Sequence, residues 1–309
     1  MKHTLKVTFL MLALFFMAQV IGLLIVNQYI DHQQLKEGKV TFTELPYKVE
    51  RPQVNQTTSF TYIFAAIILG TLILLLFIKF NLSYLWKFWF FISITYVLTV
   101  SFSAFLNIRY SQYIALALSL ALTSWRLFWP NFYIHNLTEL FVYGGLAAMI
   151  VPLLNLISVF ALLILISFYD IYAVLKSRHM IKMAQFTAKQ KVFAGMFLQY
   201  KEERKKAAKV TIAPKISTQK VASVKNAILG GGDIGFPLIF AGVVMKDLML
   251  KHSVIIGFLE TLIVVLFVTL ALAYLFWKGE KEKFYPAMPY LSGGCLAGWL
   301  VVMVIEYII

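Results

Sequence analysis

The sequence predicts a polytopic, all-α membrane protein with nine transmembrane helices, and three observations support this fold class. The chain of 309 residues is 61% hydrophobic and only 14% charged, too few polar residues to cover the surface of a water-soluble domain. Apolar runs of about 20 residues recur, long enough as helices to cross a hydrocarbon core about 30 Å thick. The excess of basic residues is concentrated in one segment, as is typical of cytoplasmic loops in membrane proteins.

Six predicted spans precede this basic segment. The first follows Lys2 and Lys6 and is too long for a signal peptide, so we expect an uncleaved spanning helix. Pro130 is placed to end the fourth span, and Pro152 to begin the sixth. The six spans lie near residues 5 to 28, 60 to 79, 84 to 106, 110 to 129, 135 to 151 and 153 to 175.

Three further spans follow, near residues 226 to 246, 253 to 277 and 285 to 307. The intervening segment, residues 176–225, has thirteen Lys and Arg against two acids, a net charge of +11 out of the total +14. Since positive charge accumulates inside, we expect a cytoplasmic N-terminus and an external C-terminus. The prediction is one membrane domain over residues 1–309, with helices in 1–175 and 226–309. The basic cytoplasmic loop between them is expected to be partly flexible or to lie on the membrane surface.

The same composition argues against several other classes of function. A basic excess confined to one loop indicates topology, so no nucleic-acid partner is expected. The five histidines show no metal-ligand spacing, and the glycine run lacks the Gly-Lys-Ser/Thr ending of a phosphate loop. We therefore expect no cofactor and no metal.

Two of the four aspartates lie inside apolar runs, Asp170 in the sixth span and Asp233 in the seventh. A charge in the bilayer interior costs at least a few kcal/mol, so such an acid points to function. Asp170 lies six residues before Lys176, and Asp233 eight residues after Lys225. Both acids are therefore roughly 9 to 12 Å from the cytoplasmic interface on antiparallel helices, at the same depth.

Two facing carboxylates in a pocket of low dielectric cannot both ionise and share one proton. The ionised partner can take a proton from a water while the neutral partner donates to a peptide carbonyl, which is aspartic protease chemistry. Asp233 ends the run Gly230-Gly231-Gly232 and is followed by Pro237. Glycine and proline weaken a helix, so we expect the helix to be disrupted at its acid, with the backbone open to close approach.

Three motifs resemble those of the presenilin and signal peptide peptidase group of GxGD intramembrane aspartic proteases, and among them the archaeal homologues. Tyr169-Asp170 is similar to the YD pair of the sixth helix, and Gly230-Gly231-Gly232-Asp233 to the GxGD of the seventh. Pro286-Ala287-Met288-Pro289 is similar to the PAL motif of the ninth, with Met288 in place of leucine. The nine-helix layout and the basic loop match as well.

The resemblance implies an intramembrane aspartic endopeptidase of the cell membrane, with Asp170 and Asp233 as catalytic dyad. It implies that Tyr169, the glycine run 230–232 and the motif Pro286, Ala287, Met288 shape the site and help hold substrate. The partners implied are protein substrates with transmembrane helices, within the lipid bilayer. A helical substrate must be unwound before cleavage, and the resemblance places a candidate strand edge for it near Lys220 to Ser223.

The alternative function is a proton- or cation-coupled transporter or channel, because paired intramembrane acids also build ion sites. Glu260, buried in the predicted eighth span, has no role in the protease hypothesis and fits this alternative. The sequence leaves open the physiological substrates, the cleavage position, self-cleavage of the loop, the oligomeric state and any need for accessory subunits.

Overall fold

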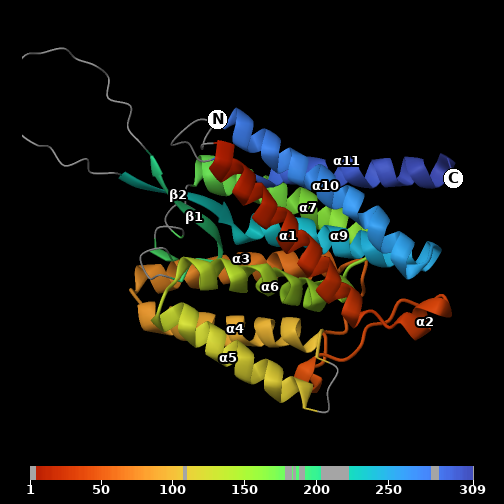
Figure 1. Ribbon diagram of the computed structural model, residues 1–309, viewed down its shortest axis with the longest axis horizontal. Helices are drawn as coiled ribbons and strands as arrows, with labels where there is room; N and C mark the ends of the chain where they lie inside the picture. Colours follow the sequence, from red (N-terminus) through yellow and green to blue (C-terminus); the bar gives the residue numbers. More distant parts are fainter. Residues whose placement is uncertain are drawn as a thin grey trace, which may run out of the picture.

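A computed structural model describes residues 5–106, 110–177, 183, 186–187, 192–202, 223–279 and 285–308. Within this part the chain is mostly helical (Figure 1). The helices of the first half are α1 (Leu5–Tyr29), α2 (His32–Lys36), η1 (Pro46–Lys48), α3 (Ser59–Lys79), α4 (Ser83–Ser103), α5 (Ser111–Phe128), α6 (Phe132–Ile150) and η2 (Val151–Leu153). The second half contains α7 (Leu156–Ile171), η3 (Tyr172–Lys176), β1 (Gly195–Glu202), β2 (Ser223–Gly230), α9 (Gly231–Lys251), α10 (Val254–Lys278) and α11 (Met288–Ile308).

Polar caps and prolines define the helix ends, as their chemistry requires. Asn131, Asn155 and Ser253 accept hydrogen bonds from backbone N–H groups in the first turns of α6, α7 and α10. Pro152 lies in the short 3₁₀ turn η2, which separates α6 from α7. The predicted break between the fifth and sixth spans is therefore confirmed.

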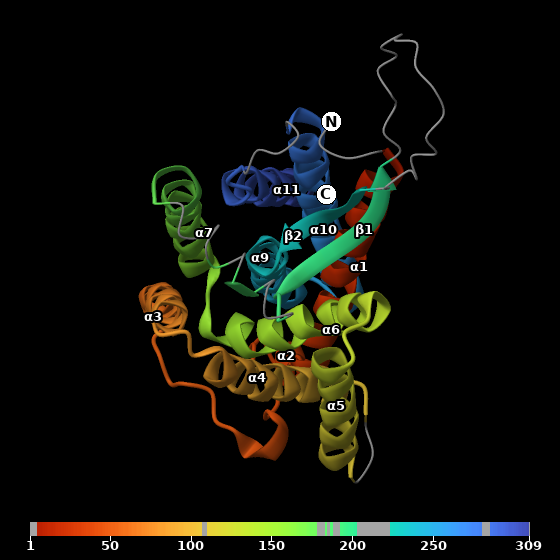
Figure 2. The ribbon, with the colours of Figure 1, turned by 90° about the vertical axis from the view of Figure 1, so that its left-hand side faces the viewer.

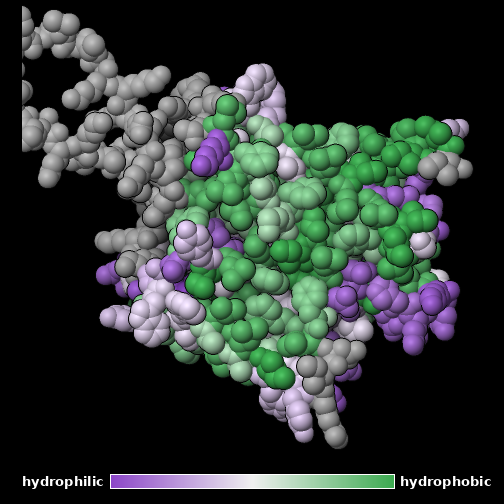
Figure 3. Space-filling view, viewed as in Figure 1, coloured by the Kyte–Doolittle hydropathy of each residue, from purple (hydrophilic) through white to green (hydrophobic). Residues whose placement is uncertain are grey.

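Seven of the described helices are long and apolar enough to cross a membrane: α1, α3, α4, α6 with η2, α7 with η3, α10 and α11. The two remaining predicted spans correspond to α5 and α9, which are not among these seven. On the face seen in Figure 3, hydrophobic side chains cover the helices broadly, and hydrophilic groups gather toward the ends. The chain is an integral membrane protein by this pattern.

Helix α9 lies at the centre of the bundle. It packs against α1, α6, α7, α10 and α11, which surround it in the view along the bundle (Figure 2). Its residues from Ile234 onward are almost all buried. Asp233, one residue before this buried stretch, is half-buried at the start of the central helix.

The prediction of an all-α chain is wrong in one respect, because β1 and β2 form a two-stranded antiparallel sheet. Its register pairs Gly195 with Gly230 and Phe197 with Ile228. β1 lies within the segment predicted to be a loop, and β2 replaces the beginning of the predicted seventh span. The helix starts at Gly231, because three glycines favour a break in regular structure and Ala227, Ile228 and Leu229 alternate between buried and exposed as a strand requires.

Candidate active site

Asp170 lies near the end of α7, just before the π-helical turn η3. Its side chain is 5% exposed. Oδ2 accepts a hydrogen bond of 3.0 Å from the backbone N–H of Met288. A buried carboxylate requires such donors, and here the donor comes from a helix 118 positions later in the chain.

The donor is available because Met288 is the first residue of α11. N–H groups in the first turn of a helix have no partner within the helix. Pro289 follows directly, where the missing N–H of proline costs nothing. The hydroxyls of Ser167 on α7 and Ser292 on α11 are 2.9 Å apart and join the same two helices. The predicted motif Pro286 to Met288 therefore lies at Asp170, with Ala287 and Met288 buried and Pro286 half-buried.

Asp233 lies in the first turn of α9, directly after the strand β2. The partial positive charge at a helix N-terminus favours an acid in this place. The carboxyls of Asp233 and Asp170 are close enough to interact electrostatically. The structure thus brings the two predicted acids into one site. The acid is at the beginning of a helix, whereas the sequence predicted an interruption within one.

The glycine run permits close approach around Asp233. A Cβ at Gly230 would lie 3.1 Å from Oδ2 of Asp233, and one at Gly231 would lie 3.1 Å from the hydroxyl oxygen of Tyr143. Gly231 also donates its N–H to the carbonyl of Ala194, at 3.3 Å. Gly232 is exposed, and a Cβ there would meet only the ring of Phe236, at 3.4 Å. Gly231 is thus the most closely surrounded of the three.

Tyr169 contacts a different helix. Its hydroxyl lies 3.0 Å from Oγ1 of Thr71, and its ring packs edge-on against Phe64, with ring centroids 6.4 Å apart. Both partners belong to α3. These contacts join α7 to α3, while the neighbouring Asp170 is bound by α11.

Sequence reasoning missed a group of buried polar side chains on α5 and α6. Arg126 forms an ion pair with Glu139, and the histidine and asparagine at positions 135 and 136 bind the backbone of β1. Tyr143, one turn after Glu139, places its hydroxyl beside Gly231. The available signal was the polar start of the predicted fifth span, where His135, Asn136, Thr138 and Glu139 fall within five residues.

Glu260 lies at the opposite end of the bundle from the two aspartates. Its carboxylate, His252 and Glu306 place one ligand atom each within 4.8 Å of one another. Lys251 pairs with Asp247 and Glu306, both at 3.4 Å, and His252 pairs with Glu306 at 3.2 Å. Oε2 of Glu260 is buried with no hydrogen-bond partner among the described residues. Asp233 and Lys251 are 18 residues apart on α9, about 27 Å, and Glu260 therefore takes no part in the aspartate site.

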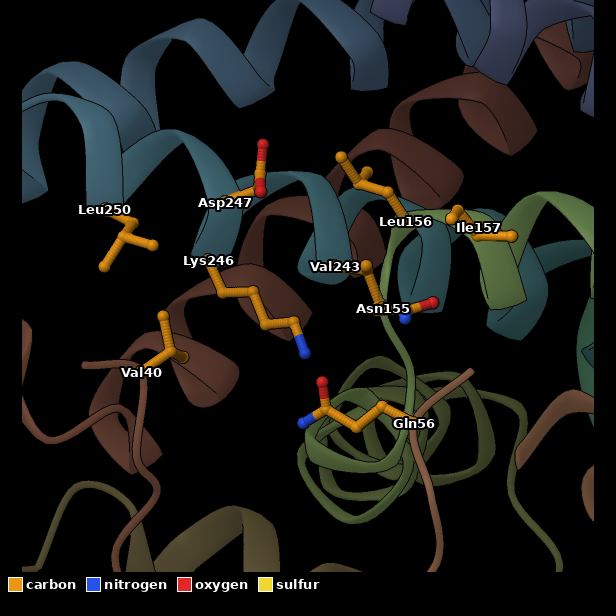
Figure 4. A pocket seen from close by; sticks show the side chains of 9 residues that line it. All are labelled: Val40, Gln56, Asn155, Leu156, Ile157, Val243, Lys246, Asp247 and Leu250. Atoms are coloured by element: carbon orange, nitrogen blue, oxygen red, sulfur yellow. The ribbon is translucent and has the colours of Figure 1, made fainter. Parts of the chain in front are cut away.

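A pocket of about 440 Å³ opens beside the C-terminal half of α9, lined by Val40, Gln56, Asn155, Leu156, Ile157, Val243, Lys246, Asp247 and Leu250. Lys246 and Gln56 extend toward each other across it (Figure 4). The buried Nζ of Lys246 donates to the carbonyls of Val151, at 3.2 Å, and Leu154. The lysine therefore holds the break between α6 and α7.

This arrangement of helices is similar to that of known proteins. The family described as signal-peptide peptidase, presenilin aspartyl protease matches residues 12–308. The fold is similar to a presenilin family intramembrane aspartate protease solved in two crystal forms. The C222 form gives a TM-score of 0.61 at 17% identity, covering 96% of this chain and 99% of the other. The P2 form gives 0.58 at 17% identity, covering 96% of each chain. At this identity the likeness shows the fold alone. No curated protein matches the chain.

Proposed function

The chain belongs to the signal-peptide peptidase and presenilin aspartyl protease family, and from this premise we propose that Asp170 and Asp233 are its catalytic pair. The protein is an intramembrane aspartic endopeptidase. The observation that carries the assignment to these residues is that α7 packs against α9, with Asp170 near the end of the first helix and Asp233 in the first turn of the second.

The pair performs hydrolysis by sharing one proton. The ionised carboxylate takes a proton from a water, and the water oxygen attacks the carbonyl carbon of the peptide bond. The neutral carboxyl donates its proton to the carbonyl oxygen. The carboxyl that accepted the proton of the water then gives it to the leaving nitrogen, and the peptide C–N bond breaks. A hydroxyl of the tetrahedral intermediate returns its proton to the other carboxylate as the new carboxyl product forms. The backbone N–H of Met288 holds Asp170 in place during these transfers.

An extended substrate segment gains backbone partners by adding to the outer edge of β2. Ile228 on this strand is 53% exposed. β2 ends at Gly230 and is followed directly by the first turn of α9, which carries Asp233. The edge predicted near Lys220 to Ser223 is adjacent: Ser223 begins β2, and residues 220–222 lie outside the described residues. Gly230, Gly231 and Gly232 shape the same site by allowing close approach, and Pro286, Ala287 and Met288 shape it from α11. Tyr169 acts indirectly, by holding α7 to α3.

The sequence predicts nine spans, and we propose α5 and α9 as the two crossings beyond the seven most apolar of the described helices. The start of α1 and the sheet lie at one end of the bundle, and the end of α11 lies at the other (Figure 1). A cytoplasmic N-terminus and an external C-terminus agree with this arrangement and with the positive charge of residues 176–225. The enzyme acts in the cell membrane on protein substrates with transmembrane helices.

The test is cleavage of a transmembrane peptide by the purified full chain in liposomes. We expect Asp170→Ala and Asp233→Ala to abolish cleavage, and Asp247→Ala, at the outer end of α9, to retain it. Cleavage undiminished in either of the first two variants contradicts the assignment. Proton-coupled flux that is lost in Glu260→Gln, with no hydrolysis by the unaltered protein, would favour the transporter.

A further inference from the structure

The outer edge of β1 is occupied by side chains of α5 and α6. The side-chain amide of Asn136 receives the N–H of Phe197 at 3.2 Å and donates to the carbonyl of Phe197 at 2.9 Å. Nε2 of His135 is 2.7 Å from the carbonyl oxygen of Gly195. Asn136 thus makes the two hydrogen bonds that a neighbouring strand would make.

A third side chain continues this edge toward the start of the strand. Nη2 of Arg126 donates to the carbonyl of Phe193, at 3.0 Å. Phe193, Gly195 and Phe197 alternate along the chain, as residues facing one edge of a strand must. Every second residue of this segment is therefore held by a side chain of the helices.

The alternation also determines which edge of the sheet is open. Since Gly195 and Phe197 face α6, Met196 and Leu198 must face β2, where they pair with Leu229 and Ala227. On β2 the residue between these two, Ile228, then directs its N–H and carbonyl to the far side. Among the described residues, no hydrogen bond is recorded to the outer edge of Ile228. Within the described residues, the sheet therefore has one edge held by side chains and one edge without hydrogen-bond partners.

The three side chains are themselves fixed by buried contacts. Arg126 is 3% exposed, pairs with Glu139 and donates to the hydroxyl of Thr138 at 3.0 Å. Nδ2 of Asn136 also donates to the carbonyl of Phe132, at 3.1 Å. The ring of His135 packs on that of Phe197, with centroids 4.7 Å apart. Burying the ion pair of Arg126 and Glu139 costs desolvation energy. Such a cost suggests that the position of β1 is important for function.

We propose that Arg126, His135 and Asn136 form an edge clamp, which closes β1 to pairing and fixes the position of the sheet relative to Asp233. This inference rests on the proposed function, in which an extended substrate adds to β2. A strand advances about 3.3 Å per residue, and its side chains alternate between faces. A shift of β2 therefore changes which peptide bond of a paired substrate reaches the two aspartates. The three residues are positioning residues, since they contact the strand and do not contact the reacting atoms.

The test compares two substitutions of Asn136. Asn136→Leu removes both hydrogen bonds to Phe197, whereas Asn136→Asp keeps an acceptor for the N–H of Phe197. Ser101→Ala is the matched control, because the hydroxyl of Ser101 donates to the carbonyl of Phe141 on α6 and makes no hydrogen bond to the sheet among the described residues. Reconstituted full-length enzyme cleaves a transmembrane peptide, and mass spectrometry identifies the bonds cut. Kinetics separate KM from kcat, and amide exchange is followed in the peptide covering residues 195–202.

We expect Asn136→Leu to distribute cleavage over neighbouring bonds, to raise KM by about tenfold for the two bonds lost, and to speed exchange in residues 195–202. Asn136→Asp is expected to lie between this variant and the unaltered enzyme, and Ser101→Ala to leave the bonds cut unchanged. If Asn136→Leu fails to fold, His135→Gln, with an expected shift in the same direction, replaces it.

The inference is overturned if folded Asn136→Leu or His135→Gln cuts the same bonds with the same KM. That result would leave the proposed function intact so long as Asp170→Ala and Asp233→Ala remain inactive. Activity in the two aspartate variants would instead overturn the proposed function itself.

Discussion

The backbone N–H of Met288 donates to Oδ2 of Asp170 over 3.0 Å. This bond joins the beginning of α11 to the end of α7, beside the first turn of α9 where Asp233 lies. It explains in physical terms how a hydrophobic motif on the last helix contributes to a polar site. The motif provides a free N–H at a helix start, and the side chain of Met288 packs in the core.

The first prediction is that the backbone N–H of residue 288, and not its side chain, supports catalysis. Met288→Leu keeps the N–H and roughly the volume, so cleavage should change less than threefold. Met288→Pro removes the donor at a helix position that tolerates proline. Because Met288→Pro also removes a buried side chain, it should lower the temperature of thermal unfolding, and kcat is compared where both variants are folded. We expect a loss of at least tenfold in kcat, corresponding to about 1.4 kcal/mol. Equal kcat values for the two variants would show that the bond to Asp170 is unimportant.

The second prediction concerns the glycine run. Gly231→Ala places a Cβ 3.1 Å from the hydroxyl oxygen of Tyr143 and 3.3 Å from the carbonyl of Ala194, and such crowding costs about 1–3 kcal/mol. We expect kcat/KM to fall by about tenfold or more, and Tyr143→Phe in the same chain to restore part of it. Gly293→Ala is the control, since an added Cβ there meets no atom beyond its own stretch of helix within 4 Å among the described residues. An unimpaired Gly231→Ala enzyme would refute the close-approach argument.

The third prediction tests the buried ion pair of Arg126 and Glu139. Both side chains are almost fully buried. Arg126→Met leaves the carboxylate without its partner and should lower the free energy of unfolding by about 3–5 kcal/mol. Arg126→Met combined with Glu139→Leu should recover most of this loss. Unfolding in mixed micelles measures both variants, and a double variant no more stable than the single one would contradict the expectation.

The fourth prediction is that Lys246, near the C-terminal end of α9, contributes to stability, whereas catalysis depends on the N-terminal end, which carries Asp233. Lys246 is 6% exposed and binds the carbonyls of Val151 and Leu154. Lys246→Met leaves these carbonyls unpaired and should lower the free energy of unfolding by about 1–3 kcal/mol. Because the lysine is 13 residues from Asp233 on α9, about 20 Å, kcat/KM should be nearly unchanged at temperatures where the variant is folded. Lys251→Met, at a residue with a 46% exposed side chain, should have a much smaller effect on unfolding. A large loss of kcat/KM in folded Lys246→Met would contradict the separation of the two ends.

Much of the helical layout could be predicted from the sequence, because the signals are local. An apolar run must be long enough to cross the hydrocarbon core, and its ends are set by neighbouring residues such as Asn155 and Pro152. The two acids could be singled out for the same reason. A carboxylate within an apolar run is costly wherever its partner lies, so Asp170 and Asp233 were identifiable before any contact was known.

The sheet could not be predicted in this way. Gly195 and Gly230 pair across 35 positions of sequence, and a strand of eight residues beside a glycine run has no periodicity long enough to distinguish it from a helix end. The start of α9 was misplaced by five residues for this reason. The contact of Asn136 with β1 could not be predicted either. A polar residue in an apolar span indicates that it has a partner but does not identify that partner.

Local sequence is enough to predict a bundle of membrane helices with two acids at one depth, because those properties depend on single segments and on the cost of placing a charge in lipid. The tertiary structure alone decided that Met288 binds Asp170, that β1 is closed by α6, and that Glu260 is remote from the acids. Each of these depends on contacts between residues far apart in the chain, and packing of the whole bundle, not any local pattern, selects among such contacts.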